Sequence, residues 1–84
     1  MSRYKCLSDL SINKSAVITE IDSDLCIAER LADMGFIEGA RITAAFSGPF
    51  GDPVAYRVNN TVIAIRKSDC LLIIVEENPY EDNR

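Results

Sequence analysis

Residues 41–65 read RITAAFSGPFGDPVAYRVNNTVIAI. Apolar side chains alternate with other residues through 41–47 and again through 54–58, and this period of two predicts half-buried β-strands. In the first of these strands the side chains expected to face the core are Ile42, Ala44 and Phe46. Asn59-Asn60 predicts a two-residue turn, because asparagine tolerates a positive φ, and residues 61–65 then return as the second arm of a hairpin. This stretch alone predicts three antiparallel strands.

Upstream of this stretch the sequence predicts one short amphipathic helix over residues 25–34. The apolar side chains at helical spacing are Ile27, Leu31 and Met34. Residues 22–24 (DSD) supply side chains expected to cap the first turn. Gly35 is expected to leave the helix through the left-handed region, with Phe36 packing back on Leu31 as in a Schellman motif.

Two further segments predict strands. Residues 16–21 (AVITEI) are rich in β-branched side chains, and either Ile18 or the pair of Val17 and Ile21 faces the core. Residues 71–75 (LLIIV) predict a last apolar strand. The sum is a mostly β protein of five short strands with one short helix after the first strand. Closing such a sheet into a small barrel removes its exposed edges.

The two ends of the chain differ in character. Leu7 and Leu10 are three positions apart and predict one helical turn that plugs an apolar end of the barrel. Residues 77–84 (ENPYEDNR) are polar and acidic and contain a proline, which predicts a disordered tail. The expected organisation is one domain over residues 1–76 followed by this tail.

Length and charge narrow the class of protein. The chain has 84 residues and a net charge of −4, with acidic residues gathered at its C-terminal end. Its basic residues are dispersed and form no continuous stripe, so no nucleic-acid binding is expected. No apolar run is long enough for a transmembrane helix, and no secretory signal precedes the domain. We therefore expect a cytoplasmic protein with no direct membrane insertion.

The side chains available for chemistry are few. The chain has no histidine, which removes the commonest metal ligand and the usual general base near neutral pH. Cys6, Cys26 and Cys70 form no CxxC pair and are interpreted as buried thiols. No nucleophile, base and orienting group come together in the sequence. We expect no catalytic residues, no metal site and no cofactor.

Three ordered motifs carry a resemblance to a known family. Arg30-Leu31-Ala32-Asp33-Met34-Gly35-Phe36 is followed by Glu38-Gly39, then by Gly51-Asp52-Pro53, and then by Ile65-Arg66 and Cys70. Over residues 7–75 the sequence resembles the FeoA family of ferrous-iron transport proteins. The resemblance implies an SH3-like five-stranded barrel. It also implies a non-catalytic accessory protein that binds the cytoplasmic part of FeoB, a membrane iron transporter with a cytosolic G-protein-like domain, and modulates it.

Two parts of the sequence are candidates for the partner interface. In the glycine- and proline-rich loop, Phe50 lies between turn-forming residues and is either an exposed anchor or a lid folded back on the barrel. Asp52 and Pro53 belong to the same loop. On the helix and just after it, the candidates are Arg30, Met34 and Phe36. Met34 and Phe36 either line a groove between helix and barrel or are simple core.

One alternative function comes from a different class. The chain could be a structural or regulatory module that associates with itself through an exposed strand edge or an apolar groove, without a direct role at the transporter. Because the chain lacks histidine, no stable binding of iron by the isolated domain is expected under either reading.

Overall fold

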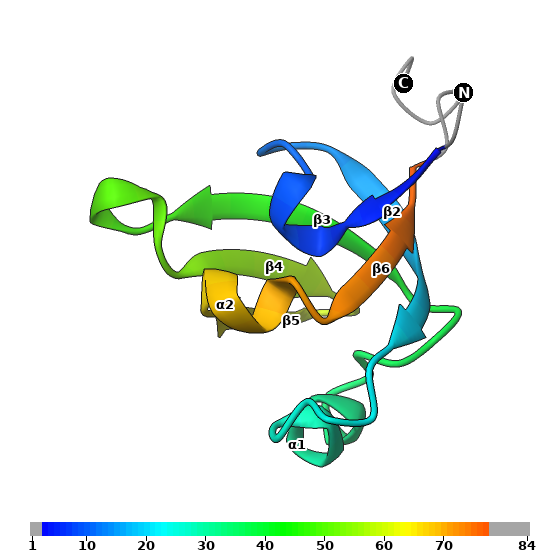
Figure 1. The fold of residues 1–84 in the computed structure, drawn as a ribbon. Helices are drawn as coiled ribbons and strands as arrows, with labels where there is room; N and C mark the ends of the chain where they lie inside the picture. Colours follow the sequence, from blue (N-terminus) through cyan, green and yellow to red (C-terminus); the bar gives the residue numbers. More distant parts are fainter. Residues whose placement is uncertain (1–2, 78–84) are drawn as a thin grey trace.

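A computed structural model describes residues 3–77 as a curved antiparallel sheet with short helical segments around it (Figure 1). The strands are β1 (Tyr4–Cys6), β2 (Ser15–Ile21), β3 (Arg41–Ser47), β4 (Val54–Val58), β5 (Thr61–Ile65) and β6 (Ile73–Glu76). The helical segments are η1 (Leu7–Asp9), α1 (Ala28–Asp33), η2 (Pro49–Gly51) and α2 (Lys67–Cys70). The expectation of a mostly β protein is confirmed.

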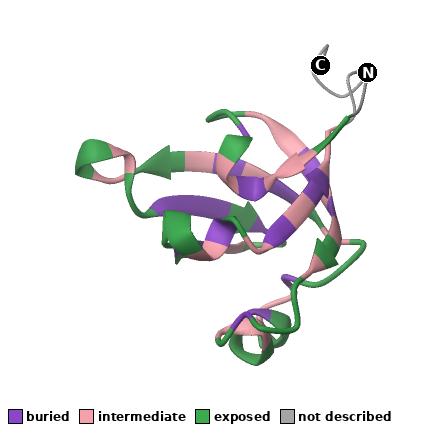
Figure 2. Cartoon of the chain, in the orientation of Figure 1, coloured by how far each residue is buried: buried purple, intermediate pink, exposed green. Residues whose placement is uncertain are grey.

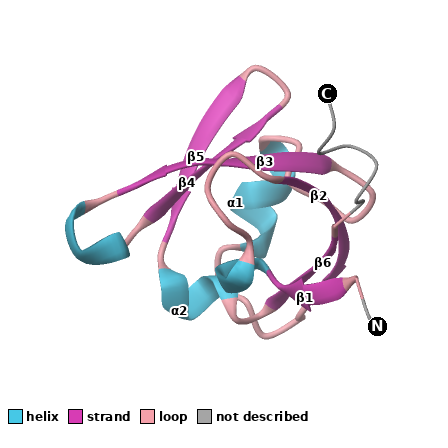
Figure 3. Ribbon diagram, turned by 90° about the horizontal axis from the view of Figure 1, so that it is seen from above, coloured by secondary structure: helices cyan, strands magenta, loops and turns pink. Residues whose placement is uncertain are grey.

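All neighbouring strands of the sheet are antiparallel, in the order β1-β6-β2-β3-β4-β5. The sheet therefore has six strands, and the prediction of five missed β1, whose three residues are too few to show a period of two. Figure 3 shows how strongly the sheet curves. Within residues 3–77 it does not close, because β1 and β5 are its two edges and do not pair. Because β1 precedes β2, α1 follows the second strand.

The curved sheet wraps around one apolar core, which Figure 2 shows as a band of buried residues along the strands. In β2 the inward set is Ala16 and Ile18, which settles the alternative that the sequence left open. Leu7 begins η1 and Leu10 follows its last residue, and both side chains are buried in the core, so the predicted apolar helical turn is confirmed.

Phe46 was expected to face the core, and this prediction is wrong. The pairing of β3 with β4 shifts between Ala44 and Phe46, so that Ala44 lies opposite Tyr56 and Phe46 lies opposite Ala55. An extra residue in one strand of an antiparallel pair reverses the side on which the following side chains lie. Phe46 consequently points outward and is 58% exposed.

The end of α1 forms as predicted, whereas its beginning does not. The Phe36 and Gly35 amides donate to the carbonyl oxygens of Leu31 and Ala32, both at 3.0 Å, which is the Schellman pattern. The expected cap from residues 22–24 is wrong, because the Asp22 carboxylate accepts the Asp24 amide at 2.8 Å in a local turn. The helix begins only at Ala28 and has no side-chain cap.

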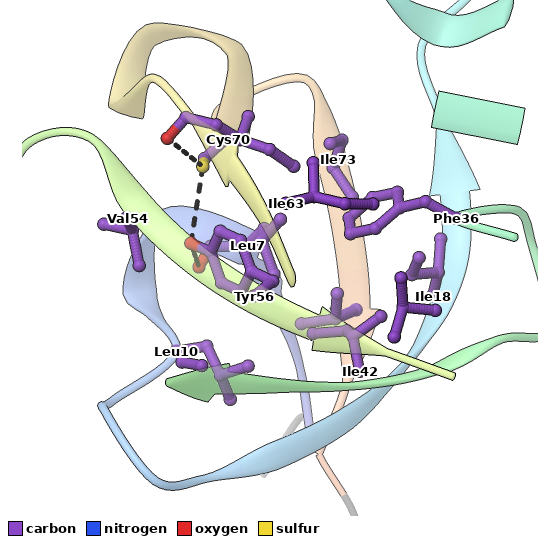
Figure 4. Close-up of a cluster of buried hydrophobic side chains, with 14 of the residues drawn as sticks. Leu7, Leu10, Ile18, Phe36, Ile42, Val54, Tyr56, Ile63, Cys70 and Ile73 are labelled. Atoms are coloured by element: carbon purple, nitrogen blue, oxygen red, sulfur yellow. Dashed lines mark hydrogen bonds between the residues drawn. The ribbon is translucent and has the colours of Figure 1, made fainter. Parts of the chain in front are cut away.

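A small set of polar contacts lies in the core around Tyr56 and Cys70, and Figure 4 draws part of it. The Tyr56 hydroxyl donates to the Leu7 carbonyl oxygen at 3.4 Å and lies 3.4 Å from the Cys70 sulfur. Burial raises the pKa of Tyr56 and the pKa of Cys70 above their ordinary values. Both groups therefore stay protonated at neutral pH, and their contact joins β4, η1 and α2 without a buried charge.

Candidate functional site

The six candidate interface residues fall into two groups on different elements, and Figure 1 shows the β3–β4 loop and α1 well apart. Phe50, Asp52 and Pro53 lie in the loop of residues 48–53 between β3 and β4, which we call the η2 loop. Arg30, Met34 and Phe36 lie on α1 or just after it. The candidates therefore lie in two separate regions of the fold.

The η2 loop is held closed by its own backbone. The Gly48 amide donates to the Pro53 carbonyl oxygen at 2.8 Å, and the Gly51 amide donates to the Gly48 carbonyl oxygen at 2.9 Å. A side chain at Gly48 would place its Cβ 2.9 Å from the Asp52 carbonyl oxygen, so the base of the loop has room only for glycine. These contacts close the loop on itself and give it a compact shape.

Phe50 is at the tip of the η2 loop and is fully exposed, at 104% of its reference surface. Its backbone has a φ of 65°, in the left-handed region that bulky residues rarely adopt. The reading of Phe50 as a lid on the barrel is therefore wrong. The structure presents an aromatic side chain to solvent on a loop that is closed by backbone hydrogen bonds.

Asp52 has a structural role that its place in the loop did not reveal. One oxygen of its carboxylate accepts the Lys67 backbone amide at 3.0 Å. Lys67 is the first residue of α2, whose N-cap residue makes no side-chain cap of its own. Asp52 thus satisfies a free N–H group at the start of α2 and ties the η2 loop to that helix.

Replacing Asp52 by alanine is expected to lower the free energy of unfolding by about 1 kcal/mol, the usual effect of losing a helix cap. Asparagine at this position keeps an acceptor oxygen and should lower the free energy of unfolding by less than alanine does. Urea denaturation followed by far-UV circular dichroism measures both changes. Equal stability of the alanine variant and the original chain would show that this hydrogen bond contributes nothing.

The residues of α1 differ in what they offer to a partner. Arg30 is exposed, and Met34 is half-buried against the core. Phe36 is completely buried, with its ring edge-on to Tyr56 at a centroid distance of 6.5 Å. The prediction that Phe36 is an interface residue is therefore wrong, because a partner cannot reach its buried side chain. Phe36 belongs to the core that supports α1.

One surface feature was not singled out from the sequence. Leu71 is 60% exposed next to a shallow hollow of about 310 Å³ between η1 and α2, lined by Ser8, Asp9, Lys67, Ser68 and Leu71.

Of the three cysteines only Cys70 is buried, so the reading of all three as buried thiols is wrong. Within residues 3–77, no three Cys, Asp or Glu side chains lie close enough together to hold a metal ion.

The profile of the FeoA domain family matches residues 5–77. The chain belongs to the FeoA family. It is 34% identical over 70 residues to an Fe(2+) transport protein A/Fe(2+) transporter FeoB fusion protein of Porphyromonas gingivalis. The match covers 83% of this chain and 8% of the fusion protein, so the chain spans less than a tenth of that relative.

Solved structures agree with the family. The FeoA protein of Chlorobium tepidum superposes with a TM-score of 0.81 at 26% identity, over 87% of this chain and 70% of that one. The FeoA of Stenotrophomonas maltophilia, a prokaryotic SH3 domain protein complexed with zinc, gives 0.71 at 31% identity, over 83% and 87%. The predicted SH3-like fold and the family resemblance are confirmed.

The same fold occurs outside the family. A manganese-dependent transcriptional repressor superposes with a TM-score of 0.78 at 11% identity, over 93% of this FeoA chain and 44% of the repressor. At this identity the likeness concerns the fold alone. In residues 3–77 none of the helices has the length and apolar character needed to span a membrane.

Proposed function

We propose that this FeoA chain is a non-catalytic cytoplasmic accessory of ferrous-iron uptake, which binds the cytoplasmic part of a FeoB-type transporter and modulates it. The observation that carries the proposal is the Porphyromonas gingivalis relative, in which protein A and the transporter are one polypeptide. Covalent fusion keeps two modules at an effective concentration in the millimolar range, which is useful when they act together. Where the two modules are not fused, the FeoA module needs a binding surface to reach the same arrangement.

The η2 loop has the properties of such a surface. Phe50 is exposed, and exposed aromatic side chains that enter a pocket on a partner are frequent binding hot spots. The backbone contacts within the loop and the Asp52 hydrogen bond to α2 order it before binding. A preordered loop loses less conformational entropy on association. We therefore assign Phe50 as the anchor, with Asp52 holding the loop and Pro53 completing its exposed face.

Replacing Phe50 by aspartate should weaken binding to the isolated cytoplasmic domain of the transporter by about tenfold or more, the effect of losing a hot spot. The fold should survive, because aspartate tolerates a positive φ better than phenylalanine does. Isothermal titration calorimetry with GDP and with a non-hydrolysable GTP analogue measures the affinity in both nucleotide states. Leu71→Asp is the matched control, because it places the same charge at an exposed apolar position outside the η2 loop.

The two ways in which this proposal fails are distinguishable. Equal affinity of the original chain and the Phe50 variant would remove the η2 loop from the interface, and Arg30→Glu in the same assay would then test α1. Absence of binding by the original chain in both nucleotide states, and to the full transporter in detergent, would contradict the accessory role itself.

A further inference from the structure

The two edges of the sheet are built differently. At one edge β1 has only three residues, and ion pairs lie beside it: Lys5 with Glu77 at 2.6 Å and Arg3 with Glu76 at 3.4 Å. Short length and charge are the features by which proteins prevent an edge strand from pairing with another chain. At the other edge β5 (TVIAI) has five residues, with no charge, no proline and no irregularity in its pairing with β4.

The backbone of β5 has hydrogen-bonding groups that face away from the sheet. Val58 and Thr61 are paired across the two-residue turn, so hydrogen bonding between β4 and β5 alternates from there. Thr61, Ile63 and Ile65 face β4, while the amides and carbonyls of Val62 and Ala64 face outward. In the part of the chain that the structure describes, neither residue makes a backbone hydrogen bond elsewhere. In the strand order β5 is an edge strand, with β4 as its one neighbour in the described sheet.

From this edge we infer that two copies of this FeoA chain associate through antiparallel pairing of their β5 strands. A two-fold axis beside Ile63 places Val62 of one copy opposite Ala64 of the other, twice, and aligns all the outward-facing groups. A closed two-fold pairing of this kind is self-complementary. It goes beyond the proposed transporter role and does not depend on it.

The outer face of the sheet favours a second copy as the occupant. Phe46, Ala55 and Ala64 lie side by side across β3, β4 and β5, and Phe46 is exposed. In the pair this apolar row continues onto Val62 of the second copy, which is 48% exposed in one chain. Each chain thus supplies both halves of the contact.

Charge does not oppose this pairing. The exposed Arg57 lies opposite Val62 on its own hairpin. The two copies of Arg57 would be three strand spacings apart across the sheet, about 14 Å, and would also be offset along the strands. That separation exceeds the screening length of about 8 Å at physiological ionic strength. Because two short strands bury much less surface than a standard interface of about 1,600 Å², we expect weak, concentration-dependent dimers.

Sedimentation equilibrium over about 10–500 μM measures the association. In the V62E/A64E dimer, the glutamate at position 62 of one copy lies opposite the glutamate at position 64 of the other. Within each chain, the glutamate at position 62 faces Arg57. Like charges directly opposite destabilise strand pairs, and with two such pairs the dimer dissociation constant should rise about tenfold or more. V62T/A64T is the neutral control. V62K/A64K alone should show the same weakening, and mixing it with V62E/A64E should restore dimers as mixed pairs.

Several results would overturn the inference. One is a monomeric original chain at every concentration. Another is a dimer that V62E/A64E leaves unchanged, because association would then use a different surface. If the original chain is monomeric but V62E/A64E loses affinity for the transporter domain, the β5 edge pairs with the transporter and not with a second copy. Circular dichroism shows whether each variant is folded, and if the lysine variant is not, the glutamate and threonine variants decide alone.

Discussion

Replacing Phe36 by alanine is expected to lower the free energy of unfolding by about 3–5 kcal/mol, the usual range for truncating a buried phenylalanine. Phe36 is fully buried, and its ring meets the Tyr56 ring edge-on at an interplanar angle of 63°. A domain of this size has a total stability of only about 4–13 kcal/mol. The variant should therefore be partly unfolded or close to it at 37 °C.

Urea and thermal denaturation, followed by far-UV circular dichroism because the chain has no tryptophan, measure this loss. Phe36→Leu is the control. Leucine keeps most of the buried volume, so the loss should be about 1–2 kcal/mol. A loss below about 1 kcal/mol for the alanine variant would mean that Phe36 is not part of the core.

Gly35→Ala is expected to lower the free energy of unfolding by about 2–3 kcal/mol, and Gly39→Ala by about 1–2 kcal/mol. The two glycines have nearly the same φ, 90° and 91°, so alanine meets similar backbone strain at both. Only at Gly35 would the new Cβ overlap another group, the side-chain nitrogen of Asn59 in the β4–β5 turn. The difference between the two variants therefore measures the close approach of α1 to this turn.

A double-mutant cycle with Asn59→Gly separates strain from overlap. Glycine retains the positive φ of Asn59 and removes the side chain that the new Cβ would meet. In the Asn59→Gly background, Gly35→Ala should cost no more than Gly39→Ala does. Equal losses of unfolding free energy for Gly35→Ala and Gly39→Ala in the original chain would mean that the Asn59 side chain moves aside at no cost. Its closeness to Gly35 would then not affect stability.

The elements that the sequence predicted well are those with a local cause. The hairpin over residues 54–65 follows from alternation and from Asn59-Asn60, and the end of α1 follows from Gly35. The errors come from effects that the local pattern does not contain. A register shift turned Phe46 outward, and Asp22 bonded to its own backbone instead of capping α1.

The candidate interface was predictable only in part. Turn-forming neighbours indicated that Phe50 could be exposed, and the structure exposes it. The bond from Asp52 to Lys67 joins residues on different elements, and no spacing rule predicts such a contact. Phe36 has a chemistry that suits both an interface and a core, and only the packing of α1 against Tyr56 decides between them. The open β5 edge depends on the order of all six strands, which local patterns do not specify.

The neighbouring positions of β1 and β6 have a mechanical consequence. Tyr4 at the start of β1 is paired with Glu76 at the end of β6, so the chain enters and leaves the domain at the same corner. Tension applied to the chain before β1 and after β6 would act on the β1–β6 hydrogen bonds one pair at a time, beginning at Tyr4 and Glu76. β1 would therefore peel away at low force, before the load reached the η2 loop or α1.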